Sequence, residues 1–182
     1  MNIAVILAGG KGVRMGTERP KQFLEIDGTP VIVTTAKIFE EHPGIDAIYI
    51  ICLKEHCIFL RDLLKKYGFK KVKDILPGGE TRQASSFIAV DYLYRLHAPG
   101  DIVLIHDAAR PGVDSRIISE NIAAAEKNGA CNTVIPSQDT IPVSYTHLDV
   151  YKRQIIISAC SAFPVIAYPF SVSMPAMISA ST

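Results

Sequence analysis

Hydrophobic positions along the chain follow first a strand pattern and then a helix pattern. Asn2 to Leu7 is an apolar run rich in Ile and Val that stops at glycines, as a buried parallel strand leading into a loop does. Ile32, Ala36 and Phe39 then recur at helical spacing, and the segment ends at His42-Pro43-Gly44. The first two predicted elements are therefore a strand and a helix.

The same alternation continues to about residue 135. It predicts further strands at 47–53, 72–76, 102–105 and 133–135, and helices at about 59–67, 81–96 and 115–128. Strands that alternate with helices indicate an α/β fold, here a Rossmann-like, mostly parallel sheet with helices on both faces. In such sheets ligands bind beyond the carboxyl ends of the strands, so the segments after the predicted strands are the candidate functional regions.

The last part of the chain has a different character. Residues 155–182 contain no Asp, Glu, Lys or Arg, and three prolines interrupt a segment without helical or strand periodicity. Residues 144–154 resemble a translated linker sequence. We therefore expect an incomplete nucleotidyltransferase domain at 1–141 and a non-native or disordered tail at 142–182. A real extension and a poor membrane anchor are the alternatives, although prolines and serines disfavour a spanning helix.

Composition narrows the class of protein. A length of 182 residues suits one domain, and a net charge of +1 gives no broad electrostatic footprint for DNA or RNA. The four cysteines form no CxxC pair, which favours reduced thiols, and no secretion signal is visible. We expect a cytoplasmic protein that binds neither nucleic acid nor membrane.

A glycine-rich loop follows the first predicted strand. Gly9, Gly10 and Gly12 allow backbone amides to approach phosphate oxygens closely. Arg14 and Lys21 add two cations near the same crevice. The spacing fits neither the GxGxxG dinucleotide pattern nor the Walker A pattern. Fixed cations and Mg²⁺ stabilise the charge that develops when a nucleoside triphosphate is attacked at its α-phosphorus, so the loop favours nucleotidyl transfer.

Several motifs follow one another along the chain. They are LAGGKGVRMG and PKQFL near the start, then PGGETRQAS, HDAARP and Asp139-Thr140. In these motifs residues 1 to about 141 resemble the cytidylyltransferases that make CDP-methylerythritol or CDP-ribitol. The resemblance implies a fold of the nucleotide-diphospho-sugar transferase type, truncated at its C-terminus. It also implies transfer of CMP from CTP to a polyol phosphate with release of pyrophosphate.

The acceptor expected from the resemblance is 2-C-methyl-D-erythritol 4-phosphate, in isoprenoid precursor synthesis by the non-mevalonate pathway. D-ribitol 5-phosphate is the alternative acceptor, and a CTP-binding module without turnover is the alternative function. An NAD-dependent oxidoreductase is disfavoured because Cys52-Leu53-Lys54 provides no acidic residue after the second strand.

The resemblance also implies roles for individual residues. It implies that Ala8, Gly9 and Gly10 line the CTP site, that Arg14 and Lys21 stabilise the pentavalent transition state, and that Gly79, Glu80 and Ser85 contact the cytidine. In the family, Thr140 and the arm after it reach into the neighbouring subunit of a homodimer and help bind the acceptor phosphate.

Three residues in HDAARP are interpreted from their position. Asp107 ends an apolar strand, which suits a Mg²⁺ ligand beside the phosphates, although a turn or cap role is the alternative. Arg110 is interpreted either as binding the acceptor or a partner subunit, or as pairing with a structural carboxylate. His106 is expected to be a packed histidine and not a base, since attack by a phosphate oxygen needs no strong proton abstraction.

Overall fold

The fold is built on a six-stranded sheet with the strand order β5-β4-β1-β6-β8-β7. This computed structural model describes residues 1–10, 20–98, 100–133 and 166–169. Four strands are parallel, and they are β1 (Asn2–Ala8), β4 (Ala47–Cys52), β5 (Val72–Pro77) and β6 (Ile102–Asp107). Two short strands, β7 (Cys131–Asn132) and β8 (Ile166–Pro169), pair antiparallel beside β6. The predicted α/β class with a mostly parallel sheet is confirmed.

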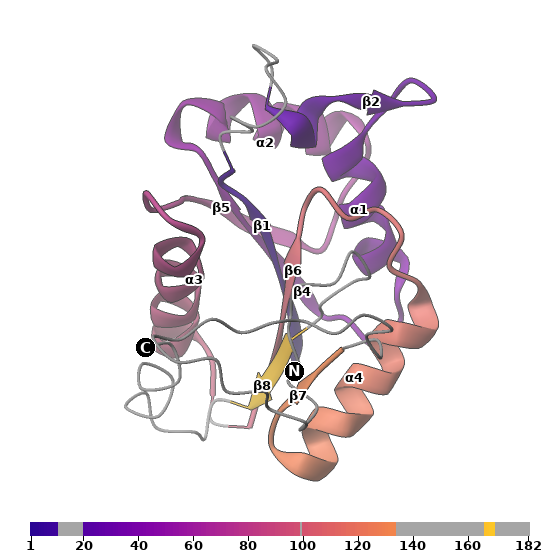
Figure 1. The fold of residues 1–182 in the computed structure, drawn as a ribbon, viewed down its shortest axis with the longest axis vertical. Helices are drawn as coiled ribbons and strands as arrows, with labels where there is room; N and C mark the ends of the chain where they lie inside the picture. The colour runs from indigo at the N-terminus through magenta and orange to yellow at the C-terminus, as the bar shows by residue number, and fades with distance from the viewer. Residues whose placement is uncertain (11–19, 99, 134–165, 170–182) are drawn as a thin grey trace, which may run out of the picture.

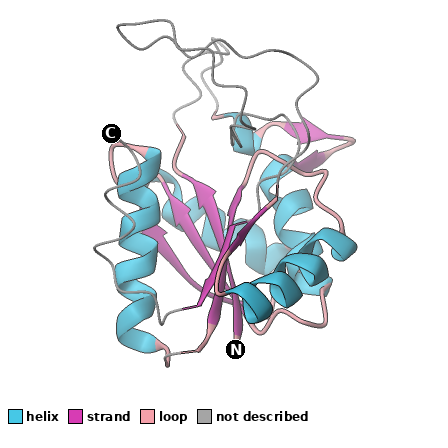
Figure 2. Cartoon of the chain, turned by 60° about the horizontal axis from the view of Figure 1, so that its bottom comes forward, coloured by secondary structure: helices cyan, strands magenta, loops and turns pink. Residues whose placement is uncertain are grey.

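Helices cover both faces of the sheet, as predicted. The α-helices are α1 (Val31–Glu41), α2 (Cys57–Lys66), α3 (Arg82–Leu96) and α4 (Ser115–Asn128), and the 3-10 helices are η2 (Lys21–Phe23) and η3 (Lys54–His56). Figure 1 shows α3 on one side of the sheet and α1 and α4 on the other, and Figure 2 shows the same separation from a second direction.

Alternate residues of the central strands pack into two separate cores. Ala4 and Ile6 of β1 belong to the core shared with α1, α2 and α4, whereas Ile3 and Val5 belong to the core shared with α3. These four side chains are fully buried. Burying one large aliphatic side chain contributes roughly 1.5–3 kcal/mol. A strand buried on both faces reads as a continuous apolar run, which is why β1 was visible in the sequence.

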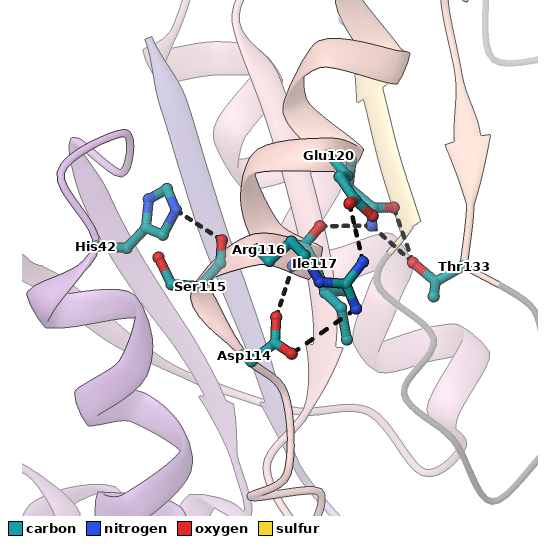
Figure 3. A network of polar contacts seen from close by, with 8 residues as sticks. His42, Asp114, Ser115, Arg116, Ile117, Glu120 and Thr133 are labelled. Carbon is teal, nitrogen blue, oxygen red and sulfur yellow. Dashed lines mark hydrogen bonds and ion pairs between the residues drawn. The ribbon is translucent and has the colours of Figure 1, made fainter.

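The helices that follow β5 and β6 begin at side-chain caps. The Thr81 hydroxyl accepts a 3.0 Å hydrogen bond from the backbone of Ala84 in α3, and the Asp114 carboxylate accepts a 2.8 Å bond from Ile117 in α4. Figure 3 shows the second cap together with His42, whose Nε2 lies 3.1 Å from the carbonyl oxygen of Ser115. The C-terminal end of α1 is thereby fixed to the start of α4.

Three short elements differ from the prediction. The hairpin of β2 (Glu25–Ile26) and β3 (Thr29–Pro30) was not predicted, although φ values of 51° at Asp27 and 74° at Gly28 suit an Asp-Gly hairpin turn. Of the strand predicted at 133–135, only Thr133 is described, and it lies just outside β7, which ends at Asn132; residues 134–135 lie outside the described residues. β8 lies where no element was expected. Strands of two to four residues are too short to show a periodicity.

Within the described residues, no helix combines the length and apolarity needed to cross a membrane. The boundary predicted near residue 141 lies outside the described residues, so the division of the chain into two parts stays a prediction.

Candidate active site

A cavity of about 470 Å³ lies at the carboxyl ends of β1 and β6, beside the start of α3. Its size is within the range of small-molecule sites, and its position is where open α/β sheets bind ligands. Described residues of the glycine-rich loop and of the PKQFL, PGGETRQAS and HDAARP motifs meet there. The lining residues are Leu7, Ala8, Gly9, Gly10, Lys21, Gln22, Glu80, Thr81, Arg82, Ser85, Asp107, Ala108, Ala109 and Arg110.

The glycine loop and the lysine after it form one wall. A side chain at Gly9 would come within 3.3 Å of the Ser85 hydroxyl, and one at Gly10 within 4.0 Å of Lys21 Cε. The buried Gln22 donates a 2.7 Å hydrogen bond through Nε2 to the carbonyl of Ala8. The segment that carries Lys21 is thereby fixed against the end of β1.

Ser85 fixes the start of α3, next to the glycine loop, through its own hydrogen bonds. Its hydroxyl donates to the carbonyl of Thr81 at 2.9 Å and accepts from the amide of Gly79 at 3.2 Å. A Cβ atom at Gly79 would lie 2.6 Å from Cβ of Ala84, so only glycine fits there. Glu80 and Ser85 line the cavity, whereas Gly79 is outside its lining and holds the loop behind it.

Asp107 lies at the centre of an ion-paired group. Its Oδ1 accepts a 3.1 Å hydrogen bond from Arg82 Nε, and its Oδ2 accepts a 2.9 Å bond from Arg110 Nε. Arg110 thus pairs with a carboxylate, and its role toward the acceptor or a partner subunit stays a prediction. The next residue is also fixed, because the buried Thr35 hydroxyl lies 2.8 Å from the carbonyl oxygen of Ala108.

The donor set suits Mg²⁺ only as an ion shared with phosphates. Among the residues that the structure describes, no group of three or more His, Cys, Asp or Glu side chains could hold a metal alone. Mg²⁺ typically takes one or two protein carboxylates and completes its shell with phosphate oxygens and water. Asp107 and Glu80 line the cavity and supply such carboxylates, and each oxygen of Asp107 keeps a lone pair beyond its arginine contact.

His106 is a packed histidine, as expected. Its side chain is fully buried, its ring centroid lies 5.3 Å from that of Phe39, and neither ring nitrogen has a hydrogen-bond partner among the described residues. Burial lowers the pKa of His106 to about 4, so the ring is neutral at physiological pH. It points into the core and offers no base to the cavity.

The structure places eight of the predicted site residues in the cavity lining, and they are Ala8, Gly9, Gly10, Lys21, Glu80, Ser85, Asp107 and Arg110. Arg14 and Thr140 lie outside the described residues, so their roles stay predictions. Sequence reasoning assigned no role to Arg82 or Gln22. Both lie inside motifs noted above, but no local signal indicated their roles, because the groups they contact, Asp107 and the carbonyl of Ala8, lie 25 and 14 residues away along the chain.

The fold and the cavity together define an α/β protein whose cavity lies beyond the carboxyl ends of a parallel sheet, where such sheets typically bind phosphorylated ligands. Lys21 lines that cavity beside a glycine-rich turn, and Arg82 and Arg110 pair there with Asp107, so the lining carries a net positive charge that suits phosphate groups.

Comparison with known proteins gives the family. The profile described as IspD, 2-C-methyl-D-erythritol 4-phosphate cytidylyltransferase, matches residues 2–154. The chain therefore belongs to the IspD cytidylyltransferase family. It is 43% identical over 153 residues to a ribitol-5-phosphate cytidylyltransferase of Vibrio parahaemolyticus, covering 84% of this chain and 64% of the relative. It is 42% identical over 142 residues to a 2-C-methyl-D-erythritol 4-phosphate cytidylyltransferase of Clostridium perfringens, covering 78% and 61%.

Solved structures agree on the fold. The crystal structure of 4-diphosphocytidyl-2C-methyl-D-erythritol synthase from Anaerococcus prevotii superposes with a TM-score of 0.68 at 24% identity, over 93% of this chain and 70% of that one. The Francisella tularensis 2-C-methyl-D-erythritol 4-phosphate cytidylyltransferase gives 0.67 at 22% identity, over 93% and 72%. The chain spans slightly less than two thirds of the length of the curated relatives reported above.

Proposed function

We propose that the chain transfers CMP from CTP to a polyol phosphate and releases pyrophosphate. The observation that carries this proposal is the meeting of the glycine loop, PGGETRQAS and HDAARP segments in one cation-lined cavity. An acceptor phosphate oxygen forms a bond to the α-phosphorus of CTP, and the bond from that phosphorus to the bridging oxygen of pyrophosphate breaks. Family membership supports cytidine as the nucleoside.

Residues of the cavity have separate tasks in this proposal. Backbone amides at Gly9 and Gly10 approach the phosphates, and the Lys21 ammonium stabilises the charge that develops on the transferred phosphoryl group. The resemblance assigns Arg14 the same task. Asp107 would hold Mg²⁺ together with the triphosphate, and the bound ion would supply positive charge to neutralise the departing pyrophosphate. Glu80 and Ser85, which also line the cavity, contact the cytidine.

For the acceptor, the alternative expectation has better support than the main one. The ribitol-5-phosphate cytidylyltransferase of Vibrio parahaemolyticus is 43% identical over 153 residues, and that of Streptococcus agalactiae is 38% identical over 142 residues. The 2-C-methyl-D-erythritol 4-phosphate enzyme of Clostridium perfringens matches at 42%. We therefore propose D-ribitol 5-phosphate as the preferred acceptor and 2-C-methyl-D-erythritol 4-phosphate as the competing one.

A pyrophosphate-release assay tests both proposals. We expect release with CTP, Mg²⁺ and D-ribitol 5-phosphate, slower release with 2-C-methyl-D-erythritol 4-phosphate, and none when UTP replaces CTP or when EDTA removes the metal. Faster release with the methylerythritol substrate would reverse the choice of acceptor. No release with either acceptor, in a chain that binds CTP, would overturn the proposed transfer.

A CTP-binding module without turnover is the second candidate. Calorimetric titration with CTP separates the two candidates when it is followed by the release assay, because the module predicts heat of binding and no pyrophosphate. The homodimer stays a proposal from the resemblance and the cytoplasmic location a proposal from the sequence, and light scattering during gel filtration tests the first.

A further inference from the structure

Arg82 occupies an unfavourable place for a cation in α3. It is the first residue of the helix, directly after the cap residue Thr81. The amino-terminal end of a helix carries a positive partial charge, so an arginine there weakens the helix slightly. Its side chain is 54% exposed, and an ion pair at such exposure adds little stability. Neither helix formation nor folding stability explains the position of Arg82.

Its contact with Asp107 offers an explanation. Arg82 Nε donates to Oδ1 of Asp107 at 3.1 Å, while Arg110 Nε donates to Oδ2 at 2.9 Å. Arg82 belongs to α3, Asp107 to the last position of β6, and Arg110 to the loop that follows. All three residues line the cavity. The Asp107 carboxylate therefore links the start of α3 to the loop after β6, and both segments line the cavity.

The backbone around Asp107 is fixed independently of these arginines. Asp107 is in register with Leu7 of β1, and the amide of Ala108 donates a 2.9 Å hydrogen bond to the carbonyl of Leu7. The hydroxyl of Thr35 lies against the carbonyl of Ala108 on the other side. The backbone contacts do not fix the direction of the Asp107 carboxylate or neutralise its charge. The guanidinium groups of Arg82 and Arg110 do both.

We propose that Arg82 is a positioning residue: with Arg110 it orients the Asp107 carboxylate and neutralises its charge, so that the cavity accepts a triphosphate. The inference rests on the proposed function, because the triphosphate is CTP. Arg82 acts through Asp107 and does not itself bind the substrate. Without Arg82 the carboxylate is less well neutralised, and its charge opposes the incoming phosphates.

A double-mutant cycle on CTP binding tests this assignment. The dissociation constant for CTP is measured by calorimetry in EDTA, so that loss of a Mg²⁺ ligand does not contribute, for the unaltered chain, Arg82→Ala, Asp107→Asn and the double variant. We expect Arg82→Ala alone to weaken binding roughly tenfold, the effect of losing one charge-assisted contact. In the Asp107→Asn background the same change should cost less than about twofold, because no charge is left to neutralise.

Direct contact between Arg82 and a phosphate makes the opposite prediction. The loss caused by Arg82→Ala would then be as large in the Asp107→Asn background as in the unaltered chain, or larger, and that result would overturn the inference. Arg82→Lys keeps the positive charge beside Asp107 and should recover part of the affinity. Arg95→Ala is the matched control, because Arg95 is on the same helix, 73% exposed and paired with Asp91, and it should leave CTP affinity unchanged.

A second measurement separates failure of the inference from failure of the proposed function. If the unaltered chain binds no CTP, the proposed function is overturned. The positioning contact is then judged from nitrogen-15 spectra, in which the Arg82 Nε–Hε signal should shift in Asp107→Asn and the Arg95 signal should not. An unchanged Arg82 signal would overturn the inference without reference to CTP.

Discussion

Two adjacent residues, Lys21 and Gln22, show how the cavity combines chemistry with support. Lys21 lines the cavity at the start of η2, and Gln22, beside it, is 1% exposed and bonded to the carbonyl of Ala8. The buried amide holds the backbone, so the lysine next to it needs no structural role of its own. A cation held in this way is suited to stabilising a transition state.

We expect Lys21→Ala to lower kcat about 100-fold while CTP affinity changes by less than about fivefold, because stabilisation of the developing charge matters most in the transition state. Pyrophosphate release gives kcat, and calorimetry gives the dissociation constant. Lys37→Ala is the control, since Lys37 is exposed on α1 and pairs with Glu41 away from the cavity lining. An equal loss in both quantities would reduce Lys21 to a binding residue.

Two glycines with different surroundings give a second prediction. Gly79→Ala should lower the free energy of unfolding by about 1–3 kcal/mol, because the new Cβ would lie 2.6 Å from Cβ of Ala84. Gly10→Ala should cost much less, since its nearest neighbour is the flexible end of Lys21 at 4.0 Å. Urea titration of both variants measures the difference. Equal stabilities would mean that the loop around Gly79 relaxes to accept a methyl group.

At the scale of elements, the long strands and helices were predictable and the short ones were not. β1 and β4 are buried on both faces and read as apolar runs, and α1 and α4 show a clear apolar stripe. β7 and β8 depend on pairing with partners distant in the chain, and such pairing leaves no local signal. The same reason explains Arg82, whose meaning comes only from the proximity of Asp107.

The two helix caps provide a prediction at this scale. Thr81→Ala and Asp114→Ala each remove a bond to the first turn of a helix, so each should lower the free energy of unfolding by about 1 kcal/mol. Only Thr81 lines the cavity, and only its loss should also weaken CTP binding. Urea titration and calorimetry measure the two effects. Weaker CTP binding in Asp114→Ala would show that any loss of helix stability reaches the cavity.

For the whole molecule, His106 predicts how stability depends on pH. Its pKa is about 4 in the folded chain and about 6.5 when unfolded, so the unfolded state binds the extra proton between these values. The contribution of neutral His106 is complete above about pH 6.5 and is lost as pH falls toward 4. The shift corresponds to about 3 kcal/mol of unfolding free energy.

His106→Leu isolates that contribution. The variant removes the titrating ring and its unpaired nitrogens while filling a similar volume, so we expect equal or higher stability at pH 7 and a shallower decline between pH 6.5 and 4. Thermal unfolding at several pH values measures both. His56, a half-buried residue of η3 whose ring contacts that of Phe23, is the control position, and His56→Leu should keep the steep decline. The same slope in both variants would assign the pH dependence to other groups.

The central position of β1 determines when the cavity can form during synthesis. Ile3 pairs with Ala47 in β4 and with Val103 in β6, so one wall of the cavity waits for a strand about 100 residues further along. Bringing such distant segments together closes large loops, which slows folding. A nascent chain therefore carries the apolar β1 unpaired on its β6 side until residue 107 has left the ribosome. During that time β1 has an unpaired, apolar edge that is prone to aggregation, and a chaperone that binds apolar segments would bind it.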